Sequence, residues 1–362
     1  MDKNKPSRFS PGKEPGKAAH LLVIRLSALG DVAMTVPVLR TLVQLYPELK
    51  LTIVSKPFYQ PLFTGIPRLN FYAAEVNGKH KGMRGLWKLA SGLGALDIDA
   101  VADLHQVLRS NMIGLFFRGK GIPVVQIDKG RKEKKALTRK RQKIFLPLKS
   151  TPQRYADVFK QLGFPVDLSQ HRFPPKKERT GNITGIMGAD GNKWIGIAPF
   201  AAHKGKTYPP DLMEKVIAIL SRAGDYTIIL FGGGEAEITA LKQWAVRYEK
   251  VVNAAGVFSF EEELALISNL DLMVAMDSGN AHLAAIYGVP VLTLWGVTHP
   301  FAGFYPFGQP PENALLPDRE QYPLIPTSVY GKTCPKDYEN AMRSIPPETV
   351  VEKMLDILKN SP

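Results

Sequence analysis

The sequence predicts an α/β protein of two domains, each built around a parallel sheet. Three observations support this prediction. The chain has 362 residues, which exceeds the size at which one hydrophobic core usually stops growing. Short apolar segments alternate with helical segments along most of its length, an order typical of parallel sheets. Finally, each half contains one strand–turn–helix unit with a polar turn, at residues 20–45 and 272–295.

Composition excludes several classes of protein. Hydrophobic residues make up 44% and charged residues 22%, as in ordinary globular proteins. The single cysteine, Cys334, excludes an internal disulfide framework and fits a reducing compartment. No apolar run approaches the ~20 residues that span a bilayer. Residues 1–19 lack any apolar segment, so we expect a disordered basic tail instead of a secretory signal. We therefore expect a cytoplasmic protein.

The first half supplies five expected strands and four expected helices. The strand Leu21–Leu26 leads through the small-residue turn Ser27–Gly30 into a helix opened by Asp31. Further strands are expected at Leu51–Val54, Phe71–Ala74, Ala100–Leu104 and Val124–Ile127. Further helices are expected at Gly82–Gly94, Gln106–Phe117 and Thr151–Leu162.

A strongly basic run interrupts this half. Lys129–Lys143 holds nine Lys or Arg against one Glu, a local charge of +8 in a chain whose net charge is +14. A solvated loop is the simplest interpretation; the alternatives are contact with nucleic acid, an anionic membrane surface or a phosphorylated substrate. No aromatic residue is interleaved and no zinc-finger spacing is present, so we expect no nucleic-acid partner.

Residues 164–193, rich in Pro, Gly, Lys and Asn, form the expected interdomain linker. We place domains at 20–175 and 176–335, followed by a C-terminal segment at 336–362. The expected strands of the second half are Trp194–Pro199, Tyr226–Phe231, Val251–Asn253, Leu272–Met276 and Val289–Trp295. The expected helices are Asp211–Ala223, Ile238–Tyr248, Phe260–Ser268, one after the turn at 277–280, and an amphipathic helix at Pro347–Leu358.

Two polar turns of the second half are candidate ligand sites. Asp277, Ser278 and Gly279 begin a helix, and a helix N-terminus favours phosphate. An ordinary capped helix is the alternative. His282 follows one turn later, where it contacts either a phosphate or a backbone carbonyl. The glycine-rich turn Gly232–Glu237 is a weaker phosphate or ribose signal, because it is not GxGxxG and no Walker lysine follows.

These motifs, in this order, resemble glycosyltransferase family 9, the lipopolysaccharide heptosyltransferases, from about His20 to Leu358. The most specific pieces are IRLSALGDVAMTVPVLRTL, the loop Lys206–Pro209, MDSGNAHLAAIYGVPVLTLWGVTHP and MRSIPPETVVEKM. The resemblance implies a GT-B architecture, in which two Rossmann-like domains face each other across a cleft. The N-terminal domain would bind the acceptor and the C-terminal domain the nucleotide sugar. The last helix would pack back towards the N-terminal domain.

The resemblance also implies a reaction: inverting, metal-independent transfer of a heptose from ADP-heptose to an inner-core acceptor of the Kdo–lipid A type. Asp31 matches the family's catalytic carboxylate and would act as the base. Lys206 matches the lysine that balances the charge of the leaving diphosphate, with Tyr208 where tryptophan is usual. We expect neither a cofactor nor a metal, since a lysine and a helix N-terminus can replace a cation.

Binding residues follow from the same resemblance. The residues expected to bind the donor are Lys206, Glu235, Glu237, Asp277, Ser278, Gly279 and His282; Glu235 and Glu237 remain alternatives for the ribose. The basic run would meet the anionic lipid-linked saccharide through Lys134, Lys135, Arg139 and Arg141, with peripheral contact at the cytoplasmic face of the inner membrane.

One departure from the family's pattern leaves two other interpretations open. The sequence has Ala201-Ala202 where the family often places Thr or Ser against phosphate. A different nucleotide-sugar donor would explain this change. A non-catalytic binding protein on a degenerate transferase fold is the other alternative, although the joint presence of Asp31, Lys206, Asp277 and His282 argues against it.

Overall fold

The structure, a computed structural model, describes residues 19–179, 181–187, 192–224 and 226–360. They form two compact units. Unit 1 comprises residues up to Lys129 together with Thr151–Arg172, and unit 2 comprises Gly130–Ser150 and the chain from Phe173 onward. The expected tail at 1–19 lies, apart from Ala19, outside the described residues. Within the described part, no helix is long and apolar enough to cross a membrane.

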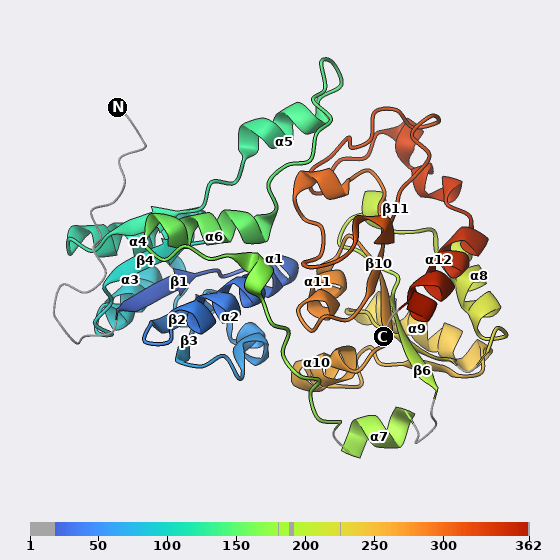
Figure 1. Cartoon of the computed structure of the whole chain (residues 1–362), viewed down its shortest axis with the longest axis horizontal. Coiled ribbons are helices and arrows are strands. Elements are labelled where there is room, and N and C mark those ends of the chain that lie inside the picture. The colour runs from blue at the N-terminus through green and yellow to red at the C-terminus, as the bar shows by residue number, and fades with distance from the viewer. Residues whose placement is uncertain (1–18, 180, 188–191, 225, 361–362) are drawn as a thin grey trace. The chain divides into compact units, whose positions relative to one another are not determined.

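Unit 1 contains a five-stranded parallel sheet in the order β3-β2-β1-β4-β5 (Figure 1). Its strands are β1 His20–Ile24, β2 Lys50–Ser55, β3 Leu69–Ala73, β4 Ala100–Asp103 and β5 Val124–Gln126. Its α-helices are α1 Leu29–Ala33, α2 Thr35–Leu45, α3 Gly82–Leu93, α4 Leu108–Gly119 and α6 Thr151–Gln161, and two 3₁₀ segments occupy Pro57–Phe63 and Leu168–Gln170.

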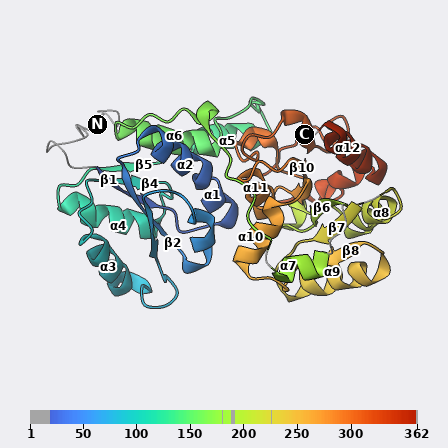
Figure 2. The ribbon, with the colours of Figure 1, turned by 60° about the horizontal axis from the view of Figure 1, so that its bottom comes forward.

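The helices cover both faces of this sheet. Leu21–Ile24 of β1 are fully buried, as expected for a central parallel strand with helices on both sides. Alternate side chains Leu22 and Ile24 share one core with α3 and α4, and α2 and α6 lie over the opposite face (Figure 2).

Unit 2 contains a six-stranded parallel sheet in the order β11-β10-β9-β6-β7-β8. Its strands are β6 Lys193–Ala198, β7 Tyr226–Leu230, β8 Val251–Asn253, β9 Leu272–Met276, β10 Val291–Leu294 and β11 Ala314–Leu315. Its α-helices are α5 Arg131–Thr138, α7 Gly181–Met187, α8 Pro210–Leu220, α9 Glu235–Arg247, α10 Phe260–Ser268, α11 Gly279–Ala285 and α12 Pro347–Asn360. Five 3₁₀ segments lie at Lys204–Lys206, Pro300–Ala302, Pro311–Asn313, Lys336–Tyr338 and Ala341–Ser344.

The last helix, α12, packs within unit 2, and its expected packing towards the N-terminal domain stays a prediction. The apolar face of α12, including Val350 and Met354, joins the core of unit 2 beside Met213 and Val216 of α8. Hydrophobic burial determines this position, because the stripe on α12 matches the apolar stripe of its neighbour.

The basic run also lies elsewhere than expected, since residues 130–150 pack with unit 2. Residues 131–138 form α5, and the Lys134 ammonium lies 4.1 Å from the ring centroid of Phe304. Lys143 donates hydrogen bonds to the carbonyls of Pro326 (2.7 Å) and Leu324. These partners lie more than 150 residues further along the chain, so no local sequence pattern indicates them.

In each sheet the strand order reverses at one place, between β1 and β4 in unit 1 and between β6 and β9 in unit 2. In open α/β sheets, ligands bind outside the carboxyl ends of the strands at such a switch point. Asp31 follows β1, the Lys206 loop follows β6 and Asp277 follows β9. The topology therefore brings the principal candidate residues to the switch point of their own unit.

Candidate active site

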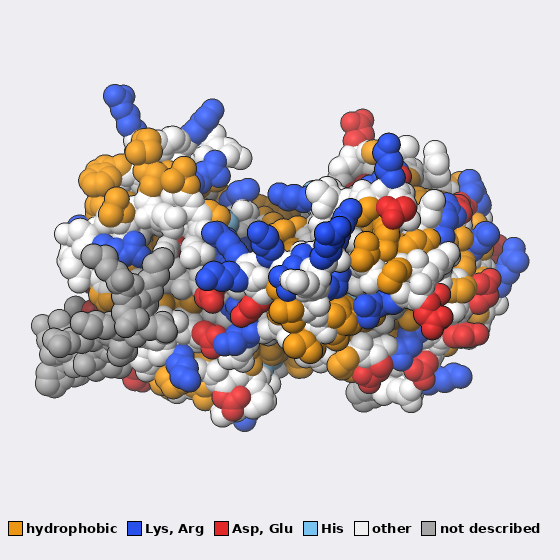
Figure 3. Space-filling view, turned by 90° about the horizontal axis from the view of Figure 1, so that it is seen from above, with side chains coloured by type: hydrophobic (Ala, Val, Ile, Leu, Met, Phe, Trp, Pro, Cys, Tyr) orange, Lys and Arg blue, Asp and Glu red, His pale blue; other side chains and the backbone are white. Residues whose placement is uncertain are grey.

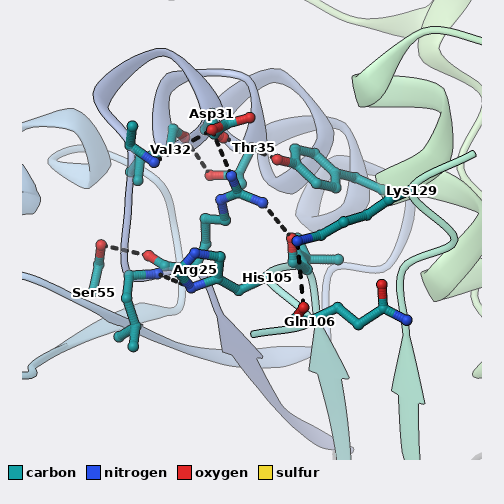
Figure 4. Close-up of polar contacts among 12 residues, drawn as sticks. Arg25, Asp31, Val32, Thr35, Ser55, His105, Gln106 and Lys129 are labelled. Atoms are coloured by element: carbon teal, nitrogen blue, oxygen red, sulfur yellow. Dashed lines mark hydrogen bonds and ion pairs between the residues drawn. The ribbon is translucent and has the colours of Figure 1, made fainter. Parts of the chain in front are cut away.

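Asp31 lies in the first turn of α1 and is held through one carboxylate oxygen. Its Oδ2 is 2.6 Å from Nη2 of Arg25 and accepts a hydrogen bond from the Ala28 N–H at 3.3 Å (Figure 4). The side chain is 29% exposed. Both contacts are made by the same oxygen, so the carboxylate is oriented while it stays accessible to solvent.

Arg25 is the buried anchor of this arrangement. It follows β1 and is 6% exposed. Besides its ion pair with Asp31, its Nη1 donates a hydrogen bond of 2.7 Å to the carbonyl of Leu104, which follows β4. A planar guanidinium can make both contacts at once. Arg25 therefore connects Asp31 to the carboxyl ends of both β1 and β4, the two strands at the switch point.

The groups around Arg25 are compatible with its charge. His105 is buried, and burial, followed by the nearby Arg25 charge, lowers its pKa to about 3. The ring is thus neutral near pH 7, and its Nδ1 accepts from the Leu26 N–H at 3.4 Å. Burial raises the pKa of Tyr155, whose hydroxyl donates to the Asp31 carbonyl at 3.2 Å. The Lys129 ammonium donates a hydrogen bond of 3.3 Å to the carbonyl of Gln106, the residue after His105 (Figure 4).

The unit 2 candidate site is built around an ion pair between Lys206 and Asp277. The Lys206 Nζ lies 2.9 Å from Oδ2 of Asp277, and the two side chains are 15% and 8% exposed. The Thr298 hydroxyl donates to the same oxygen at 2.9 Å. Asp277 therefore acts here as the ion-pair partner that positions Lys206, a role that the sequence did not indicate.

Two further residues fix the Lys206 loop. Gly331 has φ +74°, and a Cβ there would lie 2.4 Å from both Cγ and Cδ of Lys206. Tyr208 is fully buried and donates its hydroxyl to the carbonyl of Ile345 at 2.7 Å. The lysine stem therefore packs directly on a glycine backbone, and the loop is bound to the C-terminal segment.

The turn after β9 presents small polar groups. Ser278 is the N-cap of α11, but its hydroxyl makes no capping bond. This buried oxygen has no hydrogen-bond partner among the described residues, which is uncommon for a buried polar atom. Gly279 begins α11 and is half-buried, and His282 is buried one turn later.

The structure distinguishes the two glutamates of the glycine-rich turn. Glu237 is half-buried, and its Oε2 accepts a hydrogen bond of 2.9 Å from the Gly233 N–H. This contact closes the turn at the start of α9. Glu235 lies in the same helical turn with an exposed side chain.

The four basic candidates also differ from one another. Lys134 is buried, with its ammonium over the Phe304 ring. Lys135, Arg139 and Arg141 are exposed, and the Arg139 Nε donates to the Gln142 carbonyl at 2.6 Å. Lys134 thus has a packing role within unit 2.

Sequence reasoning missed Arg25, Thr298 and Gly331. Arg25 could have been found, because it is the one charged residue within the expected apolar strand Leu21–Leu26, which leads into the turn before Asp31. Thr298 and Gly331 lie in irregular loops far from Lys206, and no local pattern indicates their contact. Among the described residues, no cluster of three His, Cys, Asp or Glu is arranged to hold a metal ion.

Comparison with protein families decides the classification. The model of glycosyltransferase family 9 (heptosyltransferase) matches residues 86–323, well over half of the chain. The chain belongs to glycosyltransferase family 9. It is therefore a glycosyltransferase, and both candidate positions Lys206 and Asp277 lie inside the matched segment.

Curated relatives agree with this classification. The chain is 24% identical over 292 residues to the lipopolysaccharide core heptosyltransferase OpsX of Haemophilus influenzae, covering 77% of this chain and 80% of the relative. It is 29% identical over 180 residues to lipooligosaccharide heptosyltransferase 2 of Campylobacter jejuni. That match covers 48% of this chain and spans about half, 53%, of the relative's length.

A solved structure shows the same fold. The E. coli ADP-heptose lipopolysaccharide heptosyltransferase II superposes with a TM-score of 0.67 at 20% identity, covering 94% of this chain and 98% of that chain. The predicted fold class is confirmed: two α/β domains with parallel sheets, as in GT-B glycosyltransferases.

Proposed function

We propose that this protein transfers a heptose from ADP-heptose to a lipopolysaccharide inner-core acceptor of the Kdo–lipid A type, with inversion at the anomeric carbon and without a metal ion. The names of the relatives support the heptose and the acceptor class, and the name of the E. coli structure supports the donor. The observation that carries the proposal is the way Arg25 holds Asp31 at the switch point of unit 1.

Asp31 is the proposed base. Arg25 and the Ala28 N–H occupy Oδ2, which leaves Oδ1 to accept the proton of the acceptor hydroxyl as that oxygen attacks the anomeric carbon. A fixed carboxylate needs little reorganisation at the moment of reaction. The product then has the opposite anomeric configuration to the donor, because the attack comes from the face opposite the leaving diphosphate.

Lys206 is the proposed partner of the leaving diphosphate. Its ammonium is already positioned by Asp277 and packed on Gly331, so it can stabilise the charge that grows on the departing oxygen. The Ser278 hydroxyl and the Gly279 amide would bind a phosphate oxygen beside it. Glu235 is the better placed candidate for the ribose hydroxyls, since Glu237 closes its own turn.

The exposed residues Lys135, Arg139 and Arg141 remain the proposed contacts for the anionic lipid-linked acceptor. Guanidinium and ammonium groups bind phosphate and carboxylate well. We further propose that the protein works in the cytoplasm, in peripheral contact with the inner membrane. Replacing the three residues by Gln should raise the acceptor KM and leave donor binding unchanged. An unchanged acceptor KM would remove this part of the proposal.

A thermal-shift comparison tests the donor. ADP, UDP, GDP and CMP are each added to the wild type, to Lys206→Ala and to Lys204→Ala. Lys204 is the matched control, because it belongs to the same loop with a side chain that is 84% exposed. A nucleotide at ~100 times its Kd should stabilise the fold by about 2.7 kcal/mol. We expect this shift with ADP, its loss in Lys206→Ala and its retention in Lys204→Ala.

The other outcomes are equally informative. A shift with another nucleotide would replace ADP-heptose as donor and would fit the Ala201-Ala202 departure. No shift with any nucleotide would favour a non-catalytic binding protein. Asp31→Asn should keep the ADP shift while transfer falls by about 10²- to 10⁴-fold. The anomeric configuration of the product and the activity in the presence of a chelator test inversion and metal independence.

A further inference from the structure

One surface of unit 1 exposes large apolar side chains. Met83 and Trp87 on α3 are 70% and 63% exposed, and Leu108 and Leu115 on α4 are 76% and 67% exposed. Isolated exposed apolar residues are common, whereas a group of them on adjoining elements marks an interaction site.

These side chains belong to one continuous face. Met83 and Trp87 are four residues apart and thus share one side of α3, and Leu108 and Leu115 are seven apart on α4. The two helices adjoin, because the Trp87 ring packs edge-on against the Phe116 ring of α4 with centroids 5.3 Å apart. We call this surface the α3–α4 face.

The charged side chains on α3 and α4 are all positive. Exposed Lys and Arg side chains surround the α3–α4 face: Lys81, Arg84, Lys88, Arg118 and Lys120. Neither α3 nor α4 contains Asp or Glu. Figure 3 shows hydrophobic side chains gathered beside projecting Lys and Arg on the surface of unit 1, at the upper left. An apolar centre with a cationic rim is complementary to an anionic lipid bilayer.

We propose that the α3–α4 face docks on the surface of an anionic membrane. Trp87 and Met83 enter the boundary between headgroups and acyl chains, a position that suits the amphipathic indole ring. Arg84, Lys88 and Lys120 meet lipid phosphates. The docking face goes beyond the proposed function, since a lipid-linked acceptor requires a membrane nearby but does not say which surface meets it.

The basic run is the rival surface within the chain, because Ile144 and Leu146 are exposed next to Arg139 and Arg141. Two of its lysines are used internally, however: Lys134 over the Phe304 ring and Lys143 in bonds to backbone carbonyls. The α3–α4 face also lies on two regular helices and includes a tryptophan, Trp87. The basic run contains no tryptophan.

Intrinsic fluorescence tests the proposal on the full chain. Of the four tryptophans, Trp194, Trp244 and Trp295 are buried and Trp87 is exposed. Vesicles of phosphatidylcholine mixed with phosphatidylglycerol should therefore shift the emission to the blue through Trp87. Vesicles of phosphatidylcholine alone should produce a much smaller shift. An emission spectrum that does not change with the anionic vesicles would overturn the proposal.

Cosedimentation of variants with the same vesicles locates the surface. Met83→Gln/Trp87→Gln should bind at least tenfold more weakly, and Arg84→Gln/Lys88→Gln about tenfold to thirtyfold more weakly. The matched controls lie in unit 2: Val246→Gln/Val257→Gln and Lys215→Gln/Lys242→Gln, all at exposed positions. They should bind as the wild type does. All these positions are exposed, so unchanged thermal midpoints should confirm folding.

Two results would assign the face differently. If Ile144→Gln/Leu146→Gln loses vesicle binding and Met83→Gln/Trp87→Gln keeps it, the membrane contact lies on the basic run. If the wild type does not bind vesicles but self-associates in sedimentation velocity, and Met83→Gln/Trp87→Gln abolishes this association, the face is a protein interface. The vesicle measurement does not depend on catalysis, so its failure leaves the proposed transferase reaction untouched, and the reverse also holds.

Discussion

Both functional candidates are ionised side chains that the protein pairs internally. Asp31 is paired with Arg25, and Lys206 with Asp277. A partly buried charge without a partner costs considerable free energy, so these pairs keep the site folded before a substrate arrives. They also fix the direction of each functional group, and correct orientation of the reacting groups lowers the barrier to reaction.

Arg25→Lys tests whether Arg25 positions Asp31. A lysine has one ammonium in place of the guanidinium fork, so it cannot reach both the Asp31 carboxylate and the Leu104 carbonyl. We expect kcat to fall by about 10- to 100-fold, while the ADP-induced thermal shift stays unchanged because the proposed donor site is in unit 2. Arg68→Lys, in an exposed ion pair with Glu48, is the control. A normal kcat in Arg25→Lys would refute the positioning role.

Gly331→Ala tests whether a glycine is needed beside Lys206. The new methyl group would collide with the lysine stem, and alanine at φ +74° carries its own backbone cost of about 1–2 kcal/mol. We therefore expect both a lower thermal midpoint and a weaker response to ADP.

Gly121→Ala separates the two effects, because Gly121 has φ +76° with no atom within 4 Å of the added Cβ. It should lower the midpoint and keep the ADP response. Equal ADP responses in Gly331→Ala and Gly121→Ala would show that contact with Lys206 does not matter.

At the scale of elements, the sequence predicts those strands and helices whose positions depend on a local pattern of apolar residues. The apolar strands at 21–26 and 272–276 were expected and are found as β1 and β9 within one or two residues, because a buried parallel strand requires a continuous apolar run. Contacts between distant segments were not predictable. For residues 131–138 a solvated loop is the simplest interpretation of the sequence, and contact with an anionic partner is the alternative. The packing of Lys134 on Phe304 is not predictable, since Phe304 becomes adjacent only after folding.

Met354→Ala tests the observed position of α12. Met354 is fully buried in the core of unit 2, so truncation should destabilise the protein by about 2–5 kcal/mol. Glu352→Ala, an exposed position on the same helix, should change stability little. Thermal or urea unfolding measures both. A harmless Met354→Ala would contradict the packing of α12 on α8.

At the scale of the whole molecule, both units bury histidines in the neutral form. Burial is the main cause in each case, and it lowers the pKa of His105 to about 3 and those of His171 and His299 to about 4. Positive neighbours lower these pKa values further: Arg25 acts on His105, Arg40 on His171 and Arg319 on His299. These histidines therefore stay unprotonated in the folded protein near pH 6.5, where histidines of the unfolded chain already bind protons.

This difference predicts acid sensitivity. The unfolded chain binds more protons between pH 6.5 and about 4, so stability present above pH 6.5 is lost as the pH falls through that range. Glu263 acts in the opposite direction, because burial raises its pKa to about 7, but three histidines oppose one glutamate. Thermal midpoints across this range should fall towards acid, and less steeply in His299→Asn. A midpoint that stays level or rises would disprove the prediction.

The sequence order of the two units has a practical consequence for exchanging parts between relatives. Residues 130–150 pack with unit 2, although β5 before them and α6 after them belong to unit 1. A chimera that takes residues 19–172 as one block would separate Lys134 from Phe304 and Lys143 from Pro326. A chimera that preserves these native contacts must exchange residues 19–129 and 151–172 as two separate pieces. Residues 130–150 must then come from the same protein as the rest of unit 2.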